Sequence, residues 1–232
     1  MILKRLIGSF AIGALSISVC TAPSIRAASL EHTANSAARP ATETRTVPPL
    51  PTPGIYKIDP DHSFVYFGAW HHVVGLVRGR FDKVTGVITA SQDPSACTVD
   101  IIIDTSSIST QNAERDEDLR SPAYFDTKKF PTATYHGQGI RAAPGGYWIM
   151  DGSLSIHGMT NPVPLTFIFK GSIPDVPPGQ PPRMSFHGSA AMKRADFGIG
   201  ARDNLSELGP SPTGPDVEIE IDVEAEGTSP KQ

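Results

Sequence analysis

Seven histidines are the side chains of this sequence that could most readily bind a metal ion. Zinc sites typically gather three or four His, Cys or carboxylate ligands, and two of them often lie close together in sequence, as in H-x3-H. The sequence contains no such spacing. His71 and His72 are adjacent, so on a strand they would face opposite sides of the sheet. The pattern therefore predicts histidines that are satisfied by hydrogen bonds, and no metal site.

The segment Glu114-Arg115-Asp116 carries the groups best suited to acid–base chemistry. It falls in a stretch typical of a helix, where adjacent side chains diverge by about 100° and do not converge on one substrate atom. The sequence has no nucleophile-elbow, zinc-protease, P-loop or dinucleotide-binding motif. We expect an Arg–Asp pair that orients a loop or donates to a ligand headgroup, with no cofactor and no catalytic residue.

The composition excludes several classes of protein. The 232 residues are 39% hydrophobic and 19% charged, which excludes wholesale disorder. A formal net charge of −4 gives no basic surface for nucleic acid. The mean hydropathy of −0.15 excludes a polytopic membrane protein.

The beginning of the chain has the features of a secretory signal. Lys4 and Arg5 precede an apolar run that ends at Cys20, which is shorter than the roughly 20 residues needed to span a bilayer. We expect residues 1–27 to be cleaved, the protein to be periplasmic or secreted, and the mature chain to have no membrane span. A lipid anchor at Cys20 and an uncleaved anchor are the alternatives.

Residues 28–53 are rich in Pro, Ala and Thr and show neither a helical nor a strand period. They cannot bury enough apolar surface to offset the entropy of ordering them, so we expect a mobile tether. The folded body then spans residues 54–226 as one domain, followed by a flexible tail over 227–232. Without the signal, Cys97 is the one remaining cysteine, so the fold must rely on its core rather than on a disulfide.

The body is typical of an all-β protein, because short runs of Val, Ile, Phe, Tyr and Thr recur between turn residues. Val217–Ala225 alternates apolar and acidic residues, which predicts an apolar inner face and a solvated outer face. Other runs are apolar on both faces and need cover on the second face. The candidate strands are Ile55–Asp59, Ser63–Trp70, Leu76–Phe81, Gly86–Ala90, Thr98–Thr105, Ala133–His136, Tyr147–Met150, Ser153–His157, Val163–Gly171, Met184–Met192 and Val217–Ala225, and the helix candidate is Asn112–Arg120, capped by Asn112 or Thr110. About eight strands in a closed antiparallel barrel would leave an interior that side chains fill or that holds one small ligand.

Motifs along the body resemble the YceI-like family. The resemblance begins at Ile58-Asp59-Pro60-Asp61-His62-Ser63 and includes Ser107–Asp116, which is similar to the family's most distinctive segment. Gly79-Arg80-Phe81 belongs to the opening of the resemblance, and Lys129–Tyr135, Gly152–Thr160 and Asp196-Phe197-Gly198 follow in the expected order. Together they cover about residues 55–225.

This resemblance implies an eight-stranded, antiparallel, lipocalin-like barrel with a short helical insertion, in a protein exported to the periplasm or secreted. Family members are similar in binding long amphiphiles inside the barrel, such as isoprenoid quinones, polyprenyl phosphates and fatty amides, often as dimers. The family has no established catalytic residues. The resemblance therefore implies a binding protein rather than an enzyme, with a long-chain lipid or isoprenoid as its partner and a homodimer as one possible assembly.

We expect the ligand site to combine a dry apolar tunnel with a few polar groups for a headgroup. His62, His71, Arg115 and Asp116 match recurrent polar positions of the family, and an arginine suits phosphate or carbonyl groups. A purely structural role for Arg115 and Asp116 is equally open. The predicted ligand-binding residues are Val65, Phe67, His71, Phe81, Ile101, Ile103, Arg115, Asp116, Phe125, Phe130, Trp148 and Phe167.

Two other functions are open from the sequence. A barrel with a filled lumen could act as a stress-response or partner-docking module through an apolar outer face, and the volume of the interior distinguishes it from a lipid carrier. A lipid-modifying enzyme would need a polar triad that faces the lumen.

Overall fold

The computed structural model describes residues 48–72, 74–174, 180–200 and 213–228, all of which belong to one unit. The predicted signal peptide with Cys20, the predicted tether up to residue 47 and the last residues of the predicted tail lie outside these ranges. No helix within the described ranges is both long and apolar enough to cross a membrane.

Strands form most of the described structure. They are β1 (Gly54–Ile58), β2 (Phe64–His71), β3 (Gly75–Phe81), β4 (Val84–Ala90), β5 (Thr98–Asp104), β6 (Ile108–Ser109), β7 (Thr132–Ala143), β8 (Tyr147–Ile156), β9 (Met159–Pro162), β10 (Leu165–Ile173), β11 (Arg183–Lys193) and β12 (Thr213–Gly227). The helical elements are α1 (Ala113–Arg120) and the 3-10 turns η1 (Pro94–Ala96), η2 (Thr105–Ser107), η3 (Pro144–Gly146) and η4 (Arg194–Phe197).

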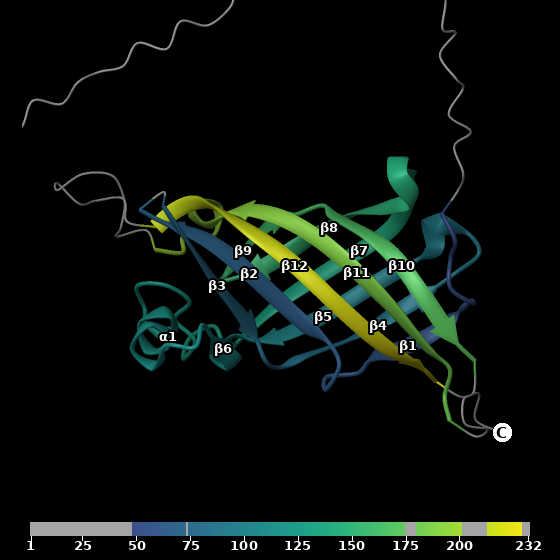
Figure 1. Ribbon diagram of the computed structural model, residues 1–232, viewed down its shortest axis with the longest axis horizontal. Helices are drawn as coiled ribbons and strands as arrows, with labels where there is room; N and C mark the ends of the chain where they lie inside the picture. Colours follow the sequence, from purple (N-terminus) through teal and green to yellow (C-terminus); the bar gives the residue numbers. More distant parts are fainter. Residues whose placement is uncertain (1–47, 73, 175–179, 201–212, 229–232) are drawn as a thin grey trace, which may run out of the picture. The chain divides into compact units, whose positions relative to one another are not determined.

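Eight of these strands close into an antiparallel barrel (Figure 1). Their order around the wall is β1-β4-β5-β7-β8-β10-β11-β12, and pairing of β12 with β1 completes the ring. The earlier residues of β12 pair instead with β2, which continues to β3 and β6, while β9 pairs with β8. The predicted eight-stranded barrel with a helical insertion is therefore confirmed.

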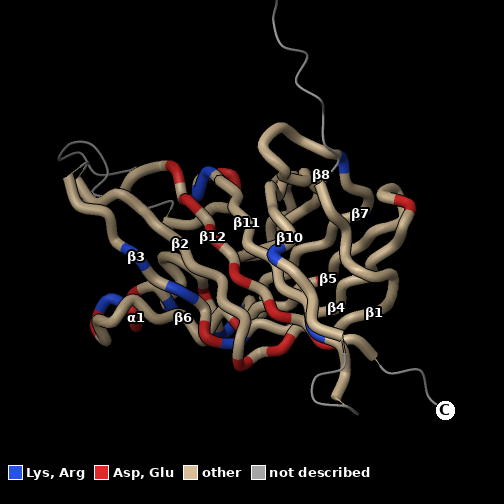
Figure 2. Tube along the Cα trace, turned by 45° about the vertical axis from the view of Figure 1, so that its right-hand side comes forward, with Lys and Arg blue, Asp and Glu red and all other residues tan. Residues whose placement is uncertain are grey.

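The strand β12 shows why the inside of the wall is apolar. Val217 and Ile221 are buried whereas Glu218 is exposed, as the alternation predicts. Figure 2 shows the acidic residues distributed along this strand. One of them, Asp222, lies 2.8 Å from Nδ1 of His187 on the neighbouring β11, so the outer face is held by polar pairs across the strands.

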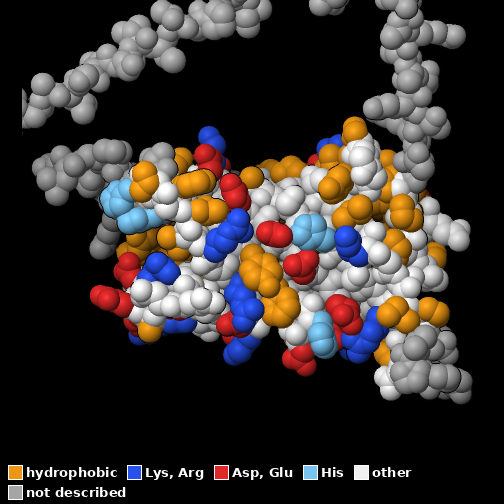
Figure 3. Space-filling model, viewed as in Figure 1, with side chains coloured by type: hydrophobic (Ala, Val, Ile, Leu, Met, Phe, Trp, Pro, Cys, Tyr) orange, Lys and Arg blue, Asp and Glu red, His pale blue; other side chains and the backbone are white. Residues whose placement is uncertain are grey.

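Strands that are apolar on both faces are only partly covered on their outer face. In β5, Ile101 and Ile103 are buried in the barrel and Ile102 is half exposed. On the outer face of β2, the ring of Phe64 is covered by the guanidinium of Arg80, which lies 5.2 Å from the ring centroid. Figure 3 shows that hydrophobic side chains on this face form small groups separated by charged ones.

The strand β8 is continuous where the sequence pattern predicts two strands, Tyr147–Met150 and Ser153–His157. Between them, Gly152 lies inside β8 and pairs with Gly137 of β7. A Cβ atom at Gly152 would collide with the hydroxyl of Tyr135. This glycine therefore makes room for a ring inside the barrel rather than for a turn.

The helix α1 and the loop after it cover one end of the barrel, near the tips of β2 and β3 (Figure 1). The side chain of Asn112 caps the helix by accepting a hydrogen bond from the amide of Arg115 at 3.0 Å, so the predicted helix and one of its two predicted caps are confirmed. The amide of Gly200 donates to the carbonyl of Ala123 at 3.1 Å. This bond ties the turn after β11 to the loop that follows α1.

Residues 48–53, which the sequence pattern assigned to the mobile tether, pack against the opposite end of the barrel. Pro48 and Pro51 are buried, and the indole Nε1 of Trp148 donates to the carbonyl of Pro49 at 3.3 Å. The hydrophobic core between these two ends holds the side chains that face inward from the strands.

Candidate functional site

A cavity of about 340 Å³ lies inside the barrel at the end covered by α1. Its size falls in the range of ligand pockets, roughly 300–1,000 Å³. Alternate residues of the surrounding strands face inward. Most of these inward-facing side chains are apolar, so they form an apolar wall. They include Val65, Ala133, Leu154, Ile156, Leu165 and Ile219. The lumen at this end is thus hollow.

Most of the predicted ligand-binding residues line this cavity: Val65, Phe67, His71, Phe81, Ile101, Ile103, Arg115 and Phe125. Phe81 lies between the rings of Phe67 and Phe125, with its centroid 5.7 Å from each. Gly79 permits this arrangement, because a Cβ atom there would collide with the ring of Phe67. The three rings form an aromatic wall near α1.

The other predicted residues lie elsewhere. Phe167 lines a second, smaller cavity in the same barrel. Trp148 is buried beside Pro49 and contacts neither cavity. Phe130 also contacts neither, because it precedes β7 and packs edge-on against the ring of His157, with the centroids 5.0 Å apart. Phe130 and Trp148 were predicted from their residue type, which does not fix the depth of a side chain along the barrel.

The helix α1 brings Arg115 to the cavity and turns Asp116 away from it. Nε of Arg115 donates to Oγ1 of Thr110 at 2.7 Å, and Nη2 donates to the Thr110 carbonyl at 2.9 Å. Asp116 is buried, faces Thr110 and does not line the cavity. The structure thereby separates the two residues: Arg115 contributes to the lining, and Asp116 holds the segment before the helix.

A second arginine at this end, Arg194, was not predicted. It is 3% exposed and lines the cavity. Its Nη1 donates to the carbonyls of Ile199 and Gly200, and its Nε donates to the carbonyl of Gly214 at 2.9 Å. These bonds hold the turn after β11 against the start of β12. The signal that could have found it is its place just before the Asp196-Phe197-Gly198 motif.

The larger cavity reaches the surface beside the turn between β2 and β3. Trp70 is 42% exposed and His71 is exposed, and both line the cavity. Val74, in the turn itself, is 86% exposed. Figure 3 shows histidine and hydrophobic side chains gathered at this end of the molecule. The entrance therefore presents apolar surface next to a few polar groups.

Tyr135 brings a polar atom into the apolar wall. Its ring lines the larger cavity, and its buried hydroxyl has no hydrogen-bond partner in the described structure. Burial, with a smaller effect from the charge of Asp151, raises the pKa of Tyr135 to about 12. The hydroxyl is therefore neutral at physiological pH and loses a hydrogen bond on folding.

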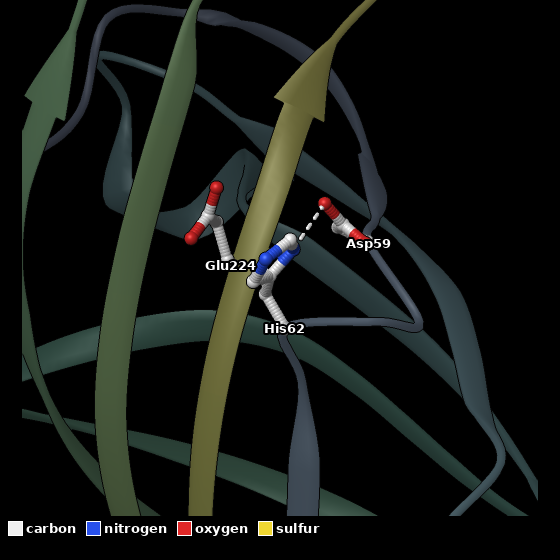
Figure 4. Close-up of side chains that lie close together, drawn as sticks. All are labelled: Asp59, His62 and Glu224. Atoms are coloured by element: carbon white, nitrogen blue, oxygen red, sulfur yellow. Dashed lines mark hydrogen bonds and ion pairs between the residues drawn. The ribbon is translucent and has the colours of Figure 1, made fainter.

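One group of potential metal ligands meets among the described residues, outside the cavity: Asp59, His62 and Glu224. Figure 4 shows His62, from the turn between β1 and β2, beside Asp59 and near Glu224 of β12. The sequence analysis missed this cluster because Glu224 is far from Asp59 and His62 in the sequence. The pairing of β12 with β1 brings the three residues together. Nη1 of Arg183 donates to Asp59 at 3.0 Å and also to Glu224. A metal ion bound there would have to displace this guanidinium.

The cluster shifts the pKa values of its members. Burial opposes ionisation of Asp59, but hydrogen bonds from His62, the Asp61 amide and Arg183 outweigh it and lower the pKa of Asp59. The hydrogen bond to Asp59 and the charge of that carboxylate raise the pKa of His62. These directions are those of an ion-pair network that fastens the turn between β1 and β2 to β12.

Comparison with known proteins now places the chain in a family. Residues 56–225 match the profile of the YceI-like domain. The chain belongs to the YceI-like family. A UPF0312 protein from Pseudomonas aeruginosa is 36% identical over 172 residues, which cover 73% of this chain and 85% of that relative. A UPF0312 protein from Yersinia enterocolitica is 32% identical over 179 residues, covering 76% and 87%.

Solved structures share the fold at low sequence identity. BcnA from Burkholderia cenocepacia matches with a TM-score of 0.59 and 20% identity, over 72% of this chain and 98% of that one. A polyisoprenoid-binding domain from Saccharophagus degradans matches with a TM-score of 0.54 and 19% identity, over 76% and 100%. These likenesses establish the barrel fold.

Proposed function

We propose that this protein binds a long-chain amphiphile in its barrel and carries or sequesters it, without transforming it. The observation that carries the proposal is the cavity of about 340 Å³, which is walled by apolar side chains. A hydrocarbon tail gains roughly 25 cal/mol for each Å² of apolar surface removed from water, so it needs few polar contacts. The ligand class is an isoprenoid quinone, a polyprenyl compound or a fatty amide.

The headgroup belongs at the α1 end. Arg115 and Arg194 line the cavity there, and the exposed His71 lies at its edge. Guanidinium groups suit phosphate and carbonyl oxygens because they offer several N–H donors in a fixed plane. The tail then points towards the opposite end of the barrel, where the lining is apolar.

The relatives support the same class of ligand. The domain from Saccharophagus degradans is described as polyisoprenoid-binding, and its barrel resembles this one in fold. The hollow interior argues against the alternative of a filled, partner-docking barrel. An enzyme acting on lipids has less support, because the sequence contains no nucleophile-elbow, zinc-protease, P-loop or dinucleotide-binding motif.

We also propose that the protein acts in the periplasm or after secretion. The support is the basic and apolar pattern over residues 1–27, which is typical of a cleaved signal. An intact mass that lacks this segment, measured on protein from the exported fraction, is the expected result. Full-length protein in the cytoplasmic fraction would contradict export but not lipid binding.

The test of binding is mass spectrometry of an organic extract of the purified protein. We expect a co-purifying prenyl or acyl lipid, and uptake of a prenyl alcohol such as geranylgeraniol after the lipid is removed. A clean extract together with no uptake by the delipidated protein would overturn the proposal.

A further inference from the structure

A second cavity of about 70 Å³ continues the larger one along the barrel. Ile101, Leu165 and Ile221 line both cavities, so the two spaces meet at one level of side chains. The smaller cavity is also lined by the inward-facing Val99 and Val223. A chain that fills the larger cavity from the α1 end therefore points directly at the smaller one.

The far boundary of the smaller cavity comes from outside the family domain. Leu50 and Pro51 line it, and both precede residues 56–225, which match the YceI-like domain. They belong to the segment Pro48-Pro49-Leu50-Pro51, which we call the proline strap. The strap is thus a feature of this chain that the domain itself does not supply.

Two hydrogen bonds hold the strap and its neighbour in place. The indole Nε1 of Trp148 donates to the carbonyl of Pro49 at 3.3 Å. The hydroxyl of Tyr56 donates to the carbonyl of Thr52 at 2.8 Å. Trp148 is 2% exposed and Tyr56 is 4% exposed, so both donors are anchored in the barrel.

The composition of the strap suits the closing of an apolar space. Three of its four residues are prolines, which carry no N–H group, so the strap can face a dry lumen with few unsatisfied donors. The proline rings also fix φ in the extended region, which lowers the entropy lost when the strap is ordered.

We infer that the proline strap is the floor of the ligand tunnel and sets the longest tail that the barrel accepts. This inference rests on the proposed lipid-binding function. The tail passes Ile101, Leu165 and Ile221, enters the smaller cavity and ends against Leu50 and Pro51. Carbons beyond that point must remain outside the dry lumen.

The experiment measures affinity for a series of all-trans prenyl alcohols of increasing length, using delipidated mature protein. In the wild type, affinity rises with length and then reaches a plateau when the tail meets the floor. Leu50→Trp should bring the plateau to a shorter alcohol. Each methylene excluded costs about fourfold in affinity, so loss of space for two should weaken the longest alcohols about 15-fold. Short alcohols should stay within about twofold.

Further variants give the opposite sign and the control. Leu50→Ala enlarges the smaller cavity, and Trp148→Phe removes the donor to Pro49, so both should move the plateau to longer alcohols. Thr52→Ala alters an exposed neighbour whose carbonyl remains, and its profile should superimpose on that of the wild type.

The inference is overturned if Leu50→Ala and Trp148→Phe leave the plateau in place and Leu50→Trp fails to shorten it. Leu50→Trp fails in this sense if it changes no affinity or if it weakens the binding of all lengths equally. Thermal unfolding of each variant shows whether it is folded. A wild type that binds none of the alcohols would instead overturn the proposed function.

Discussion

The carboxylate of Asp116 accepts two hydrogen bonds from Thr110, one from its backbone amide at 2.8 Å and one from its hydroxyl at 2.5 Å. The same hydroxyl accepts from Nε of Arg115 at 2.7 Å. One threonine therefore links an acid that is turned into the protein with an arginine that lines the cavity. This relationship explains why an Arg–Asp pair in α1 needs the preceding segment to position it.

Asp116→Ala should destabilise the fold. The substitution leaves the buried hydroxyl and amide of Thr110 without their acceptor, at an expected cost of about 2–3 kcal/mol in the free energy of unfolding. Glu117→Ala, an exposed acid in the same helix, should change it by less than about 0.5 kcal/mol. Urea unfolding of both variants measures the difference. Equal losses for the two would show that Asp116 has no special structural role.

Alanine-to-phenylalanine substitutions at two adjacent positions of β11 test whether the lumen is the binding site. Ala190 lines the larger cavity and Ala191 is exposed on the outer face. Ala190→Phe should fill part of the cavity and weaken geranylgeraniol binding at least about tenfold. Ala191→Phe should leave the affinity within about twofold. Binding that survives Ala190→Phe in a folded protein would place the ligand elsewhere.

Tyr135→Phe should stabilise the protein. It removes a buried hydroxyl without a hydrogen-bond partner in the described structure, for an expected gain of about 1 kcal/mol at neutral pH. The exposed Tyr147→Phe is the matched control and should have little effect. Chemical unfolding at pH 7 provides the measurement, and a destabilised Tyr135→Phe would show that the hydroxyl has a partner in solution.

Tyr135 should also make the wild-type protein less stable at alkaline pH. Its pKa is raised from 10.0 to about 12 in the folded state, so the unfolded chain ionises first as the pH rises. The folded state then binds the proton more tightly, and stability falls between about pH 10 and 12. The difference in unfolding free energy between wild type and Tyr135→Phe should change over this interval and stay constant below it.

The strand pattern and the family motifs were enough to predict the fold, because they depend on local sequence. Alternation in Val217–Ala225 identified the inner face of β12, and residue type and place made Asn112 one of two candidate caps for the helix. The split predicted in β8 was wrong because Gly152 accommodates the Tyr135 ring, a contact between strands that no local pattern contains.

The site was predictable only where it depends on local sequence. Inward-facing residues such as Val65 and Ile103 follow from the strand period, whereas the depth of Trp148 depends on how the strands stagger around the barrel. Proline-rich composition predicted a mobile segment, but the Trp148 indole offers the Pro49 carbonyl a partner and residues 48–53 pack on the barrel. The meeting of His62 with Glu224 likewise required the closure of β12 onto β1.

The pair of Asp59 and His62 should make stability depend on pH in a defined window. The pKa of His62 is raised in the folded state, so its contribution is complete below the unfolded pKa near 6.5 and is lost as the pH rises through the folded value. The pKa of Asp59 is lowered, so its contribution is present above about 3.8 and is lost as the pH falls through the folded value.

His62→Gln should therefore lower the melting temperature most between about pH 4 and 6.5, and little above pH 8. Adding His62→Gln to Asp59→Asn should produce no such window, since the partner is already neutral. A His62→Gln effect that is greatest at alkaline pH, where the imidazole is uncharged, would contradict an ion pair between these residues.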